Sequence, residues 1–477
     1  MDRRHFIHIS AAAACISLTD KQSFARMASL PEPPSPKGKA RLKVAVMSDI
    51  HISTPESGTF FRKALEYYDK VGVDAVMIAG DMADDGLECQ LQMVADIWNE
   101  VFPQGKGTTG RKVEKLFICG NHEIDGYRLP AAKKRWSAEE LSKGRIVGRV
   151  KRVWERCFGE KYEPVFMKEV KGFKFIGAHY PVDPDEVEIF LRSTDIPDKA
   201  PFFYFQHRHP KGTCSAPWVW GQDDGRITSL LSEYPNAIAF SGHSHSSLTD
   251  ERTLWQGAFT SVGTASMSFI VPFGGRENSK VVGSKEKVPA QMKTVNCRNG
   301  KQAQLMTVFD NCIVLEKRDF FNDESLAPEW VIPLPLTKRP LTFENRAADA
   351  VAPQFAKDSV VTLKRINGPD RYGVVKEQIV LQFPAAIHTK TSPRAFDYEV
   401  QVEYRDVDTV KTGLTKRVFS EAWHLCESQE KDVTCVFALD ELPANREYRF
   451  AVRPVECFEK KGEPIYSSWQ DAISITT

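Results

Sequence analysis

Five short apolar runs in the first half of the chain each end in polar residues. The runs are 42–47, 74–79, 115–119, 201–205 and 237–240, with the sequences LKVAVM, DAVMIA, KLFIC, PFFYF and AIAF. Runs this short, rich in β-branched and aromatic residues, predict buried strands. Apolar residues at helical spacing over 60–72 and 87–102 predict helices between the first three runs. This alternation predicts an α/β fold, in which ligands bind at the carboxyl ends of the strands.

The rest of the first 325 residues continues the same pattern. The pattern predicts mainly helical structure with many basic positions over residues 128–160. It predicts a strand at 173–180, a helix at 226–234, and β-structure at 254–266 and 304–320. The basic positions of 128–160 fit a solvated helix face, and the alternative is a rim that attracts phosphate. We therefore expect one α/β domain over residues 40–325.

The composition changes after residue 325. Pro328, Pro333, Pro335 and Pro340 indicate a stiff linker over 326–352 without helical periodicity. Beyond it the chain reads only as short strands, at 359–366, 378–383, 397–405, 435–439 and 447–455. Such spacing predicts a small antiparallel β-sandwich over 353–477. The segment LPANREYRFAV at 442–452, with the Ser-Ser-Trp at 467–469, resembles the fibronectin type III domain.

The N-terminus resembles a bacterial export signal. Arg3-Arg4-His5-Phe6-Ile7 resembles the twin-arginine motif, an apolar stretch follows as far as Leu18, and small residues flank Phe24 as signal peptidases require. We expect residues 1–30 to direct the protein to the periplasm or cell surface. The alternatives are a basic N-terminus without a signal and lipid attachment at Cys15.

Composition excludes two classes of function. A formal net charge of +1 does not suit nucleic-acid binding through bulk charge. No apolar stretch reaches the roughly 20 residues that cross a bilayer, so an integral membrane protein is not expected. The ten cysteines do not form a disulfide framework by spacing. Cys297 with Cys312, and Cys426 with Cys435, are the pairs that could form bridges.

Polar blocks follow the five apolar runs directly. They are Asp49-Ile50-His51, Gly80-Asp81-Met82-Ala83-Asp84, Gly120-Asn121-His122-Glu123, Gln206-His207-Arg208-His209-Pro210 and Gly242-His243-Ser244-His245. Residues at i and i+2 of an extended loop face the same side, so Asp49 pairs with His51. Asp81 has two oxygens and can bridge two ions. Carboxylate, imidazole and amide ligands suit Mn, Fe, Zn or Ni, which predicts a centre with two divalent or trivalent metal ions.

The order of these blocks resembles the calcineurin-like metallophosphoesterases over residues 42–320. The resemblance implies a four-layer α/β/β/α sandwich with two metals at the strand ends. It implies one metal on Asp49, His51, Asp81 and His245, and a second on Asp81, Asn121, His207 and His243. It also implies that His122 is the general acid, and that a metal-bound hydroxide attacks phosphorus in line. Purple acid phosphatases have a tyrosine where this chain has Asp84, which disfavours that subfamily.

Other polar residues near the motifs have competing interpretations. Asp84 and Glu123 are expected to orient ligands rather than bind metal. His209 is the alternative to His207 as a ligand, and His179 fits an ordinary loop histidine. Trp218 and Trp220 follow the fourth block and could stack on a nucleobase, although loop anchors are more common.

Together these features predict an exported two-metal enzyme that hydrolyses a small phosphate ester. Phosphodiesters are favoured, because the block with His122 is complete and no cluster suited to a dianion stands out. The alternatives are a phosphomonoesterase, and a catalytically silent metal-containing protein whose C-terminal sandwich contacts glycans or a surface.

Overall fold

The computed structural model describes most of the chain. The described residues are 33–215, 221–271, 275–279, 287–295, 297–326, 328–336, 339–389, 393–423 and 431–471. The predicted export signal at 1–30, Trp218 and Trp220 lie outside them. Cys312 and Cys435 are free thiols. Their expected partners, Cys426 and the side chain of Cys297, are not among the described parts.

The first sheet contains the first three predicted strands side by side. Its order is β12-β11-β10-β1-β2-β3, with β13 also paired to β11. These strands are β1 (Leu42–Met47), β2 (Ala75–Ala79), β3 (Glu114–Ile118), β10 (Gln302–Val308), β11 (Cys312–Asp319), β12 (Glu324–Ser325) and β13 (Trp330–Pro333). Strands β1, β2 and β3 are parallel, so their carboxyl ends lie at one edge.

The second sheet contains the fourth and fifth predicted strands, and its order is β4-β5-β6-β7-β9-β8. These strands are β4 (Val165–Val170), β5 (Phe173–Ala178), β6 (Phe202–Phe205), β7 (Ala237–Ser241), β8 (Leu254–Gln256) and β9 (Thr260–Gly263). Strands β5, β6, β7 and β9 are parallel. The carboxyl ends of β6 and β7 therefore lie together as well.

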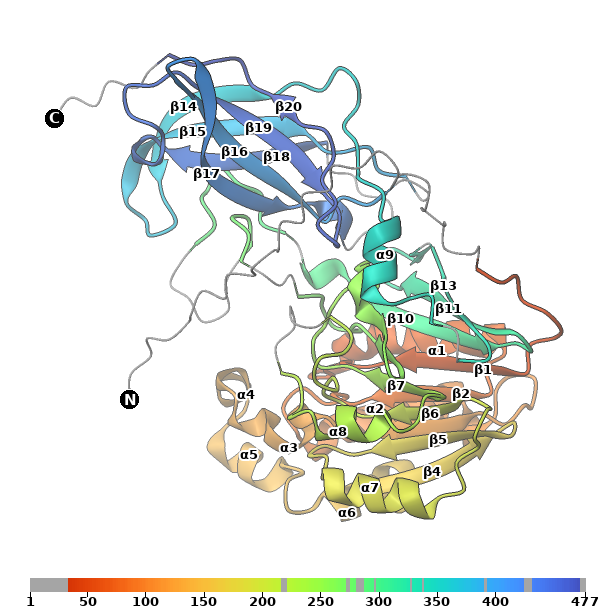
Figure 1. Cartoon of the computed structure of the whole chain (residues 1–477). Helices are drawn as coiled ribbons and strands as arrows, with labels where there is room; N and C mark the ends of the chain where they lie inside the picture. Colours follow the sequence, from red (N-terminus) through yellow and green to blue (C-terminus); the bar gives the residue numbers. More distant parts are fainter. Residues whose placement is uncertain are drawn as a thin grey trace. The chain divides into compact units, whose positions relative to one another are not determined.

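Helices cover the outer face of each sheet (Figure 1). Helices α1 (Thr59–Val71), α2 (Glu88–Val101) and α6 (Val150–Phe158) share a core with the first sheet. Helices α7 (Pro184–Ser193) and α8 (Arg226–Leu231) share one with the second. A third core, which includes Val44, Phe203 and Phe240, fills the space between the sheets. The predicted four-layer α/β/β/α sandwich is confirmed. Three short helices, α3 (Asn121–Asp125), α4 (Pro130–Arg135) and α5 (Ala138–Gly144), precede α6.

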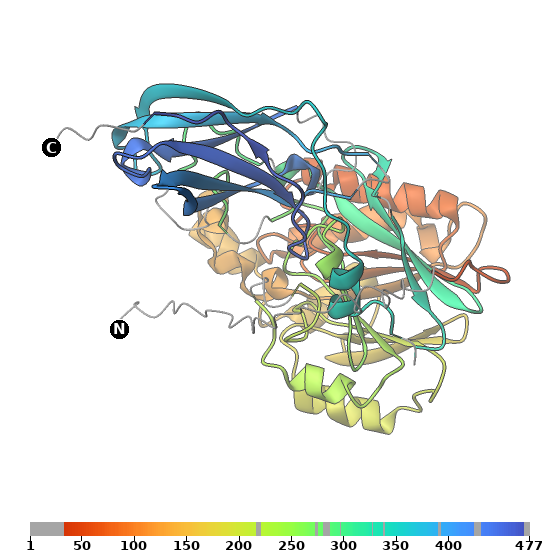
Figure 2. The same ribbon diagram turned by 45° about the horizontal axis from the view of Figure 1, so that its top comes forward.

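The C-terminal part is a sandwich of two antiparallel sheets, drawn in blue in Figure 2. One sheet is β14 (Thr362–Pro369), β15 (Val375–Pro384) and β18 (Asp432–Ala438). The other is β17 (Thr409–Phe419), β16 (Asp397–Asp406), β19 (Tyr448–Val455) and β20 (Ile465–Tyr466). Leu381, Val400 and Phe450 are among the buried residues of its core. The all-β prediction is confirmed, whereas the fibronectin likeness stays a prediction. Strand β17 was not predicted, because most of its residues are exposed and its polar sequence has no clear alternation.

The segment 326–352 is more structured than the predicted linker. It contains β13 and a short helix, α9 (Phe343–Asp349), so the expectation of a stretch without a helix is wrong. The Thr342 side chain caps α9 by accepting a hydrogen bond from Asn345 N at 3.1 Å. Arg346 donates to the carbonyl of Leu254 at 2.7 Å and forms an ion pair with Glu251. These contacts are tertiary, so apolar periodicity could not show them.

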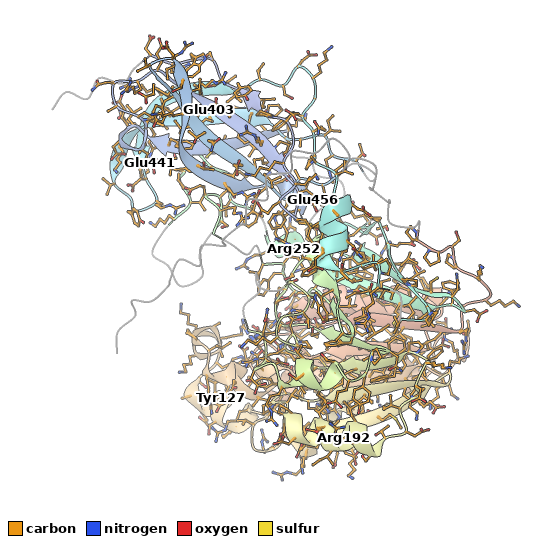
Figure 3. All side chains as sticks on the ribbon, viewed as in Figure 1. Tyr127, Arg192, Arg252, Glu403, Glu441 and Glu456 are labelled. Atoms are coloured by element: carbon orange, nitrogen blue, oxygen red, sulfur yellow. The ribbon has the colours of Figure 1, made fainter. Side chains whose placement is uncertain are left out.

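Several contacts join the C-terminal strands to the α/β part. The Thr249 hydroxyl donates to the Trp423 carbonyl. The Arg252 guanidinium, labelled in Figure 3, lies 4.5 Å from the centre of the Phe396 ring. Within the described residues, no helix is both long and apolar enough to cross a membrane.

Candidate metal centre

The loops after β1, β2, β3, β6 and β7 bring the seven predicted ligands together. The structure groups their donor atoms into three sets that overlap. These are Asp49 with His51 and His245, His51 with Asp81 and His122, and Asp81 with His207 and His243. All the members except His122 are buried. Two potential metal positions therefore lie close together, as the strand-end positions of the motifs imply.

The first group joins the loops after β1 and β7. His245 Nε2 lies 3.1 Å from Asp49 Oδ1, and His51 Nε2 lies 3.8 Å from the same oxygen. The two imidazole nitrogens lie 3.2 Å apart. Two imidazole nitrogens and a carboxylate oxygen thus converge on one point.

The second group joins the loops after β2, β3, β6 and β7. His207 Nε2 lies 3.0 Å from Asp81 Oδ2, 3.0 Å from Asn121 Oδ1 and 3.2 Å from His243 Nδ1. Asp81 Oδ2 is also 3.9 Å from His51 Nε2 of the first group. Asp81 therefore lies between the two groups.

The remaining nitrogens of three imidazoles are held by acceptors outside the centre. His51 Nδ1 lies 3.1 Å from Asp84 Oδ1, His207 Nδ1 lies 2.8 Å from the Ala79 carbonyl, and His245 Nδ1 lies 2.8 Å from the Phe269 carbonyl. Such partners hold the Nδ1 side of each ring and leave Nε2 facing the centre. This buried set of imidazole, carboxylate and amide donors fits borderline divalent cations.

Backbone strain is concentrated at the same residues. Five of the seven have positive φ, namely Asp49 at 51°, His51 at 50°, Asp81 at 52°, His243 at 66° and His245 at 53°. Residues other than glycine rarely adopt this region, and each instance costs roughly 1–3 kcal/mol. The positive φ turns the backbone at each strand end, so that the side chains of these residues lie at the candidate metal centre.

Glycines allow the loops to approach closely. A Cβ on Gly120 would lie 2.2 Å from Asp81 Oδ1 and 2.5 Å from Asp81 N. A Cβ on Gly80, whose φ is 89°, would lie 2.8 Å from Gly120 N. Any larger residue would separate the loops after β2 and β3. The glycines of these two motifs therefore allow the two loops to pack closely against each other.

Glu123 holds the same two loops from inside the protein. Its buried carboxylate accepts from the backbone N–H groups of Asp81 at 3.1 Å, Ala83 at 2.6 Å and Gly120 at 2.6 Å. Burial and the charge of Asp81 raise the pKa of Glu123 to about 7. Glu123 thus positions the Asp81 loop, and all its described contacts are to backbone nitrogens.

His122 lies beside the first group, with its ring centre 4.4 Å from that of His51. Its Nδ1 lies 2.6 Å from the Asp84 carbonyl, and its backbone N–H donates to Asp81 Oδ1 at 2.8 Å. Burial lowers the pKa of His122, but Asp81 and the Asp84 carbonyl outweigh burial and raise it. The imidazolium form is favoured there, as a proton donor requires.

Charge within the centre keeps the two aspartates ionised. Burial raises the pKa of Asp49, yet the neighbouring His245 and His207 lower it to about 2. For Asp81, burial is likewise outweighed by His207 and His122, so its pKa is held well below the usual range. Burial, His207 and, more weakly, the Arg208 charge take part in lowering the pKa of His243 to about 3. Ionised carboxylates and a neutral imidazole are the forms that bind metals.

The two competing histidines lie elsewhere. His209 Nε2 is 2.6 Å from the Ser244 hydroxyl, and its Nδ1 is 2.7 Å from the Ser241 hydroxyl. It therefore supports the loop after β7 from beneath. His179 is buried among aromatic rings and accepts from Cys119 N at 2.9 Å.

The sequence analysis did not predict two residues that contact the centre. Phe269 supplies a carbonyl to His245, and its ring centre lies 4.2 Å from that of His245. Arg135 donates to Asp84 at 2.9 Å, which holds the carboxylate that orients His51. Arg135 belongs to the basic stretch interpreted as a solvated helix face. Its charge was the only feature of the sequence that could indicate a role near the centre.

One comparison with known proteins, the match to a family model, bears on this geometry. Residues 42–247 match the family model described as calcineurin-like phosphoesterase. The resemblance based on the motifs is confirmed for this segment, which contains all seven predicted ligands. No curated protein matches the chain.

Several solved structures share only low identity with the chain. A dimetal phosphatase from Danio rerio is 9% identical, with 62% of this chain and 99% of that chain covered and a TM-score of 0.35. GAP50, the anchor in the inner membrane complex of Plasmodium, is 12% identical, with 65% and 95% covered and a TM-score of 0.36. Vps29 complexed with zinc from Entamoeba histolytica is 9% identical, with 61% and 99% covered and a TM-score of 0.28.

Proposed function

We propose that this protein is an exported, dinuclear-metal phosphoesterase that prefers phosphodiesters. The observation that carries the proposal is the pair of imidazole–carboxylate groups joined by Asp81. The family match over residues 42–247 supports hydrolysis of phosphoester bonds in general terms. Export rests on the twin-arginine-like N-terminus.

Seven residues would hold the metal ions, and His122 would supply a proton. Asp49, His51, Asp81 and His245 would hold one metal ion. Asp81, Asn121, His207 and His243 would hold the other. Bound metal ions in such a pair lower the pKa of water and neutralise phosphate charge. His122, with Nδ1 held by the Asp84 carbonyl, directs Nε2 at the leaving oxygen and gives it a proton.

Metal-dependent turnover tests the proposal directly. Metal-stripped protein reloaded with Mn²⁺ is expected to hydrolyse bis-p-nitrophenyl phosphate faster than p-nitrophenyl phosphate, because no cluster suited to a dianion accompanies the candidate ligands among the described residues. Initial rates from p-nitrophenolate absorbance, with and without Mn²⁺, measure both effects. A monoester rate about a hundredfold above the diester rate, a ΔΔG‡ of about 3 kcal/mol, would contradict the diester preference.

Replacing His122 tests its role as the acid. His122→Ala is expected to lower kcat by about 10²–10⁴-fold on diesters with poor leaving groups. The loss should be far smaller for p-nitrophenolate, which leaves without a proton. The measurement is kcat against leaving-group pKa for both proteins, with bound Mn counted by elemental analysis as the control. Equal losses across the series would show that His122 is not the proton donor.

A further inference from the structure

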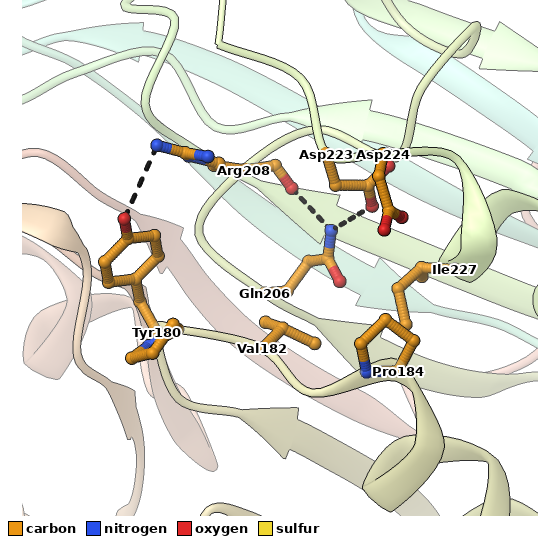
Figure 4. Close-up of a pocket in the computed structure, with 9 residues that line it drawn as sticks. Tyr180, Val182, Pro184, Gln206, Arg208, Asp223, Asp224 and Ile227 are labelled. Carbon is orange, nitrogen blue, oxygen red and sulfur yellow. Dashed lines mark hydrogen bonds between the residues drawn. The ribbon is translucent and has the colours of Figure 1, made fainter.

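A cavity of about 220 Å³ lies at the carboxyl ends of β5 and β6 (Figure 4). It is lined by Tyr180, Pro181, Val182, Pro184, Gln206, Arg208, Asp223, Asp224 and Ile227. None of these residues is among the seven predicted ligands. The cavity is therefore separate from the metal-binding residues, although it is built on neighbouring strand ends.

Two residues that line the cavity are next to a member of the second group in the chain. Gln206 and Arg208 flank His207 in the sequence. Tyr180 N donates to the carbonyl of Cys119 at 3.0 Å, and Cys119 lies two residues before Asn121. The Arg208 charge also takes part in lowering the pKa of His243, which places Arg208 near the second group. A phosphoester bound at the metal centre could extend one substituent toward Arg208.

Arg208 supplies positive charge at the cavity. Its Nη2 donates to the Tyr180 hydroxyl at 3.4 Å, and its guanidinium lies 5.2 Å from the centre of the Tyr180 ring (Figure 4). Its Nε is buried and meets no acceptor among the described residues. No carboxylate of the described chain forms an ion pair with it. An arginine in this state is suited to a phosphate oxygen.

The opposite wall carries negative charge. Asp223 accepts from Lys211 N at 3.0 Å, Gly225 N at 2.8 Å and Gln206 Nε2 at 2.9 Å, all of them neutral donors. Asp224 Oδ1 accepts from Arg226 N at 3.0 Å. Neither carboxylate has a cationic partner within the described parts of the chain. The two charges favour a cation at this wall.

The floor of the cavity is apolar. Val182, Pro184 and Ile227 lie on this side, and Tyr180 adds an aromatic ring (Figure 4). Apolar and aromatic walls with nearby carboxylates suit an alkylated ammonium group, whose charge is spread over methyl groups.

We propose that this cavity binds a short ammonium-bearing alcohol group of the substrate. Arg208 contacts the phosphate, and the charges of Asp223 and Asp224 attract the ammonium group of the same substituent. The substrate class is then a zwitterionic amino-alcohol phosphodiester, either a soluble ester or a lipid headgroup. This inference rests on the proposed phosphoesterase function.

A pair of substrates with matched shape and different charge tests the inference in the Mn²⁺-loaded full chain. p-Nitrophenyl phosphocholine carries the cation, and p-nitrophenyl 3,3-dimethylbutyl phosphate has the same shape with carbon in place of nitrogen. We expect kcat/KM to favour the choline ester by about tenfold or more. Asp224→Asn should bring that ratio toward one. Asp198→Asn, an exposed carboxylate on the loop before β6, is the matched control and should keep the ratio.

Arg208→Gln separates the two parts of the site. It should lower kcat/KM for both esters by a similar factor and leave their ratio unchanged. Glycerophosphocholine and vesicles of phosphatidylcholine, assayed side by side, distinguish a soluble ester from a lipid headgroup. If the enzyme hydrolyses neither glycerophosphocholine nor phosphatidylcholine, the inference is overturned.

Failures of the two proposals look different. Turnover of bis-p-nitrophenyl phosphate with a choline-to-dimethylbutyl ratio near one, or a ratio unmoved by Asp224→Asn, overturns only the ammonium site. Absence of turnover on every diester overturns the phosphoesterase proposal and the inference with it.

Discussion

Asp81→Asn is expected to lower kcat/KM for bis-p-nitrophenyl phosphate by about 10³-fold or more, equivalent to about 4 kcal/mol of transition-state stabilisation. Asp81 lies between the two ligand groups, 3.0 Å from His207 and 3.9 Å from His51. The amide keeps an oxygen for the His122 N–H, so the fold of the loop should survive. What is lost is the negative charge that Asp81 would offer to both proposed metal ions.

The measurement combines rates with metal content. Asp81→Asn reloaded with Mn²⁺ should retain less metal per chain than the wild type, as counted by elemental analysis after gel filtration. Asp198→Asn controls for removing one carboxylate from the surface. Wild-type turnover and metal content in Asp81→Asn would contradict the bridging role and, with it, the two-metal centre.

Glu251→Ala is expected to reduce the free energy of unfolding by about 3 kcal/mol, because it leaves a buried cation without its partner. Lys317 is fully buried and lies 3.3 Å from the Glu251 carboxylate. Trp330 Nε1 donates to the same carboxylate at 2.8 Å, and Arg346 of α9 also pairs with it. Urea unfolding followed by fluorescence measures the loss.

Two variants show whether the buried charge is the cause. Adding Lys317→Met to Glu251→Ala removes the unpaired cation and should recover part of the stability. Glu188→Ala breaks an exposed pair with Arg192 and should cost less than about 0.5 kcal/mol. A double variant no more stable than Glu251→Ala would contradict the explanation.

The same carboxylate makes stability depend on pH. Burial raises the pKa of Glu251, but the charges of Lys317 and Arg346 outweigh it and lower the pKa from 4.5 to about 2. An acid with a lowered folded-state pKa contributes stability that is fully present above its unfolded pKa and is lost as the pH falls toward the folded value. The stability difference between wild type and Glu251→Ala should therefore shrink between pH 4.5 and pH 2.

Much of the α/β part could be predicted because its strands are short, apolar and followed at once by polar blocks. Burial on both faces makes such strands recognisable without periodicity. The candidate ligands were predicted from the same blocks, since parallel strands bring their carboxyl ends to one edge. Strand β17 was not predicted, because its exposed polar residues do not alternate. Helix α9 was not predicted, because its position depends on the contacts of Arg346 with Glu251 and Leu254.

The positions of the buried strands along the chain, the types of the candidate ligands and their place at strand ends were determined by the sequence itself, because apolar burial and i, i+2 geometry are local properties. Only the tertiary structure decided which atoms meet. It turned Asp49 and Asp81 through strained backbone, assigned His209 to support rather than to the centre, and placed Arg208 and Asp224 at one cavity. Such contacts join residues far apart in the chain, and their distances depend on how the two sheets pack, which no local pattern encodes.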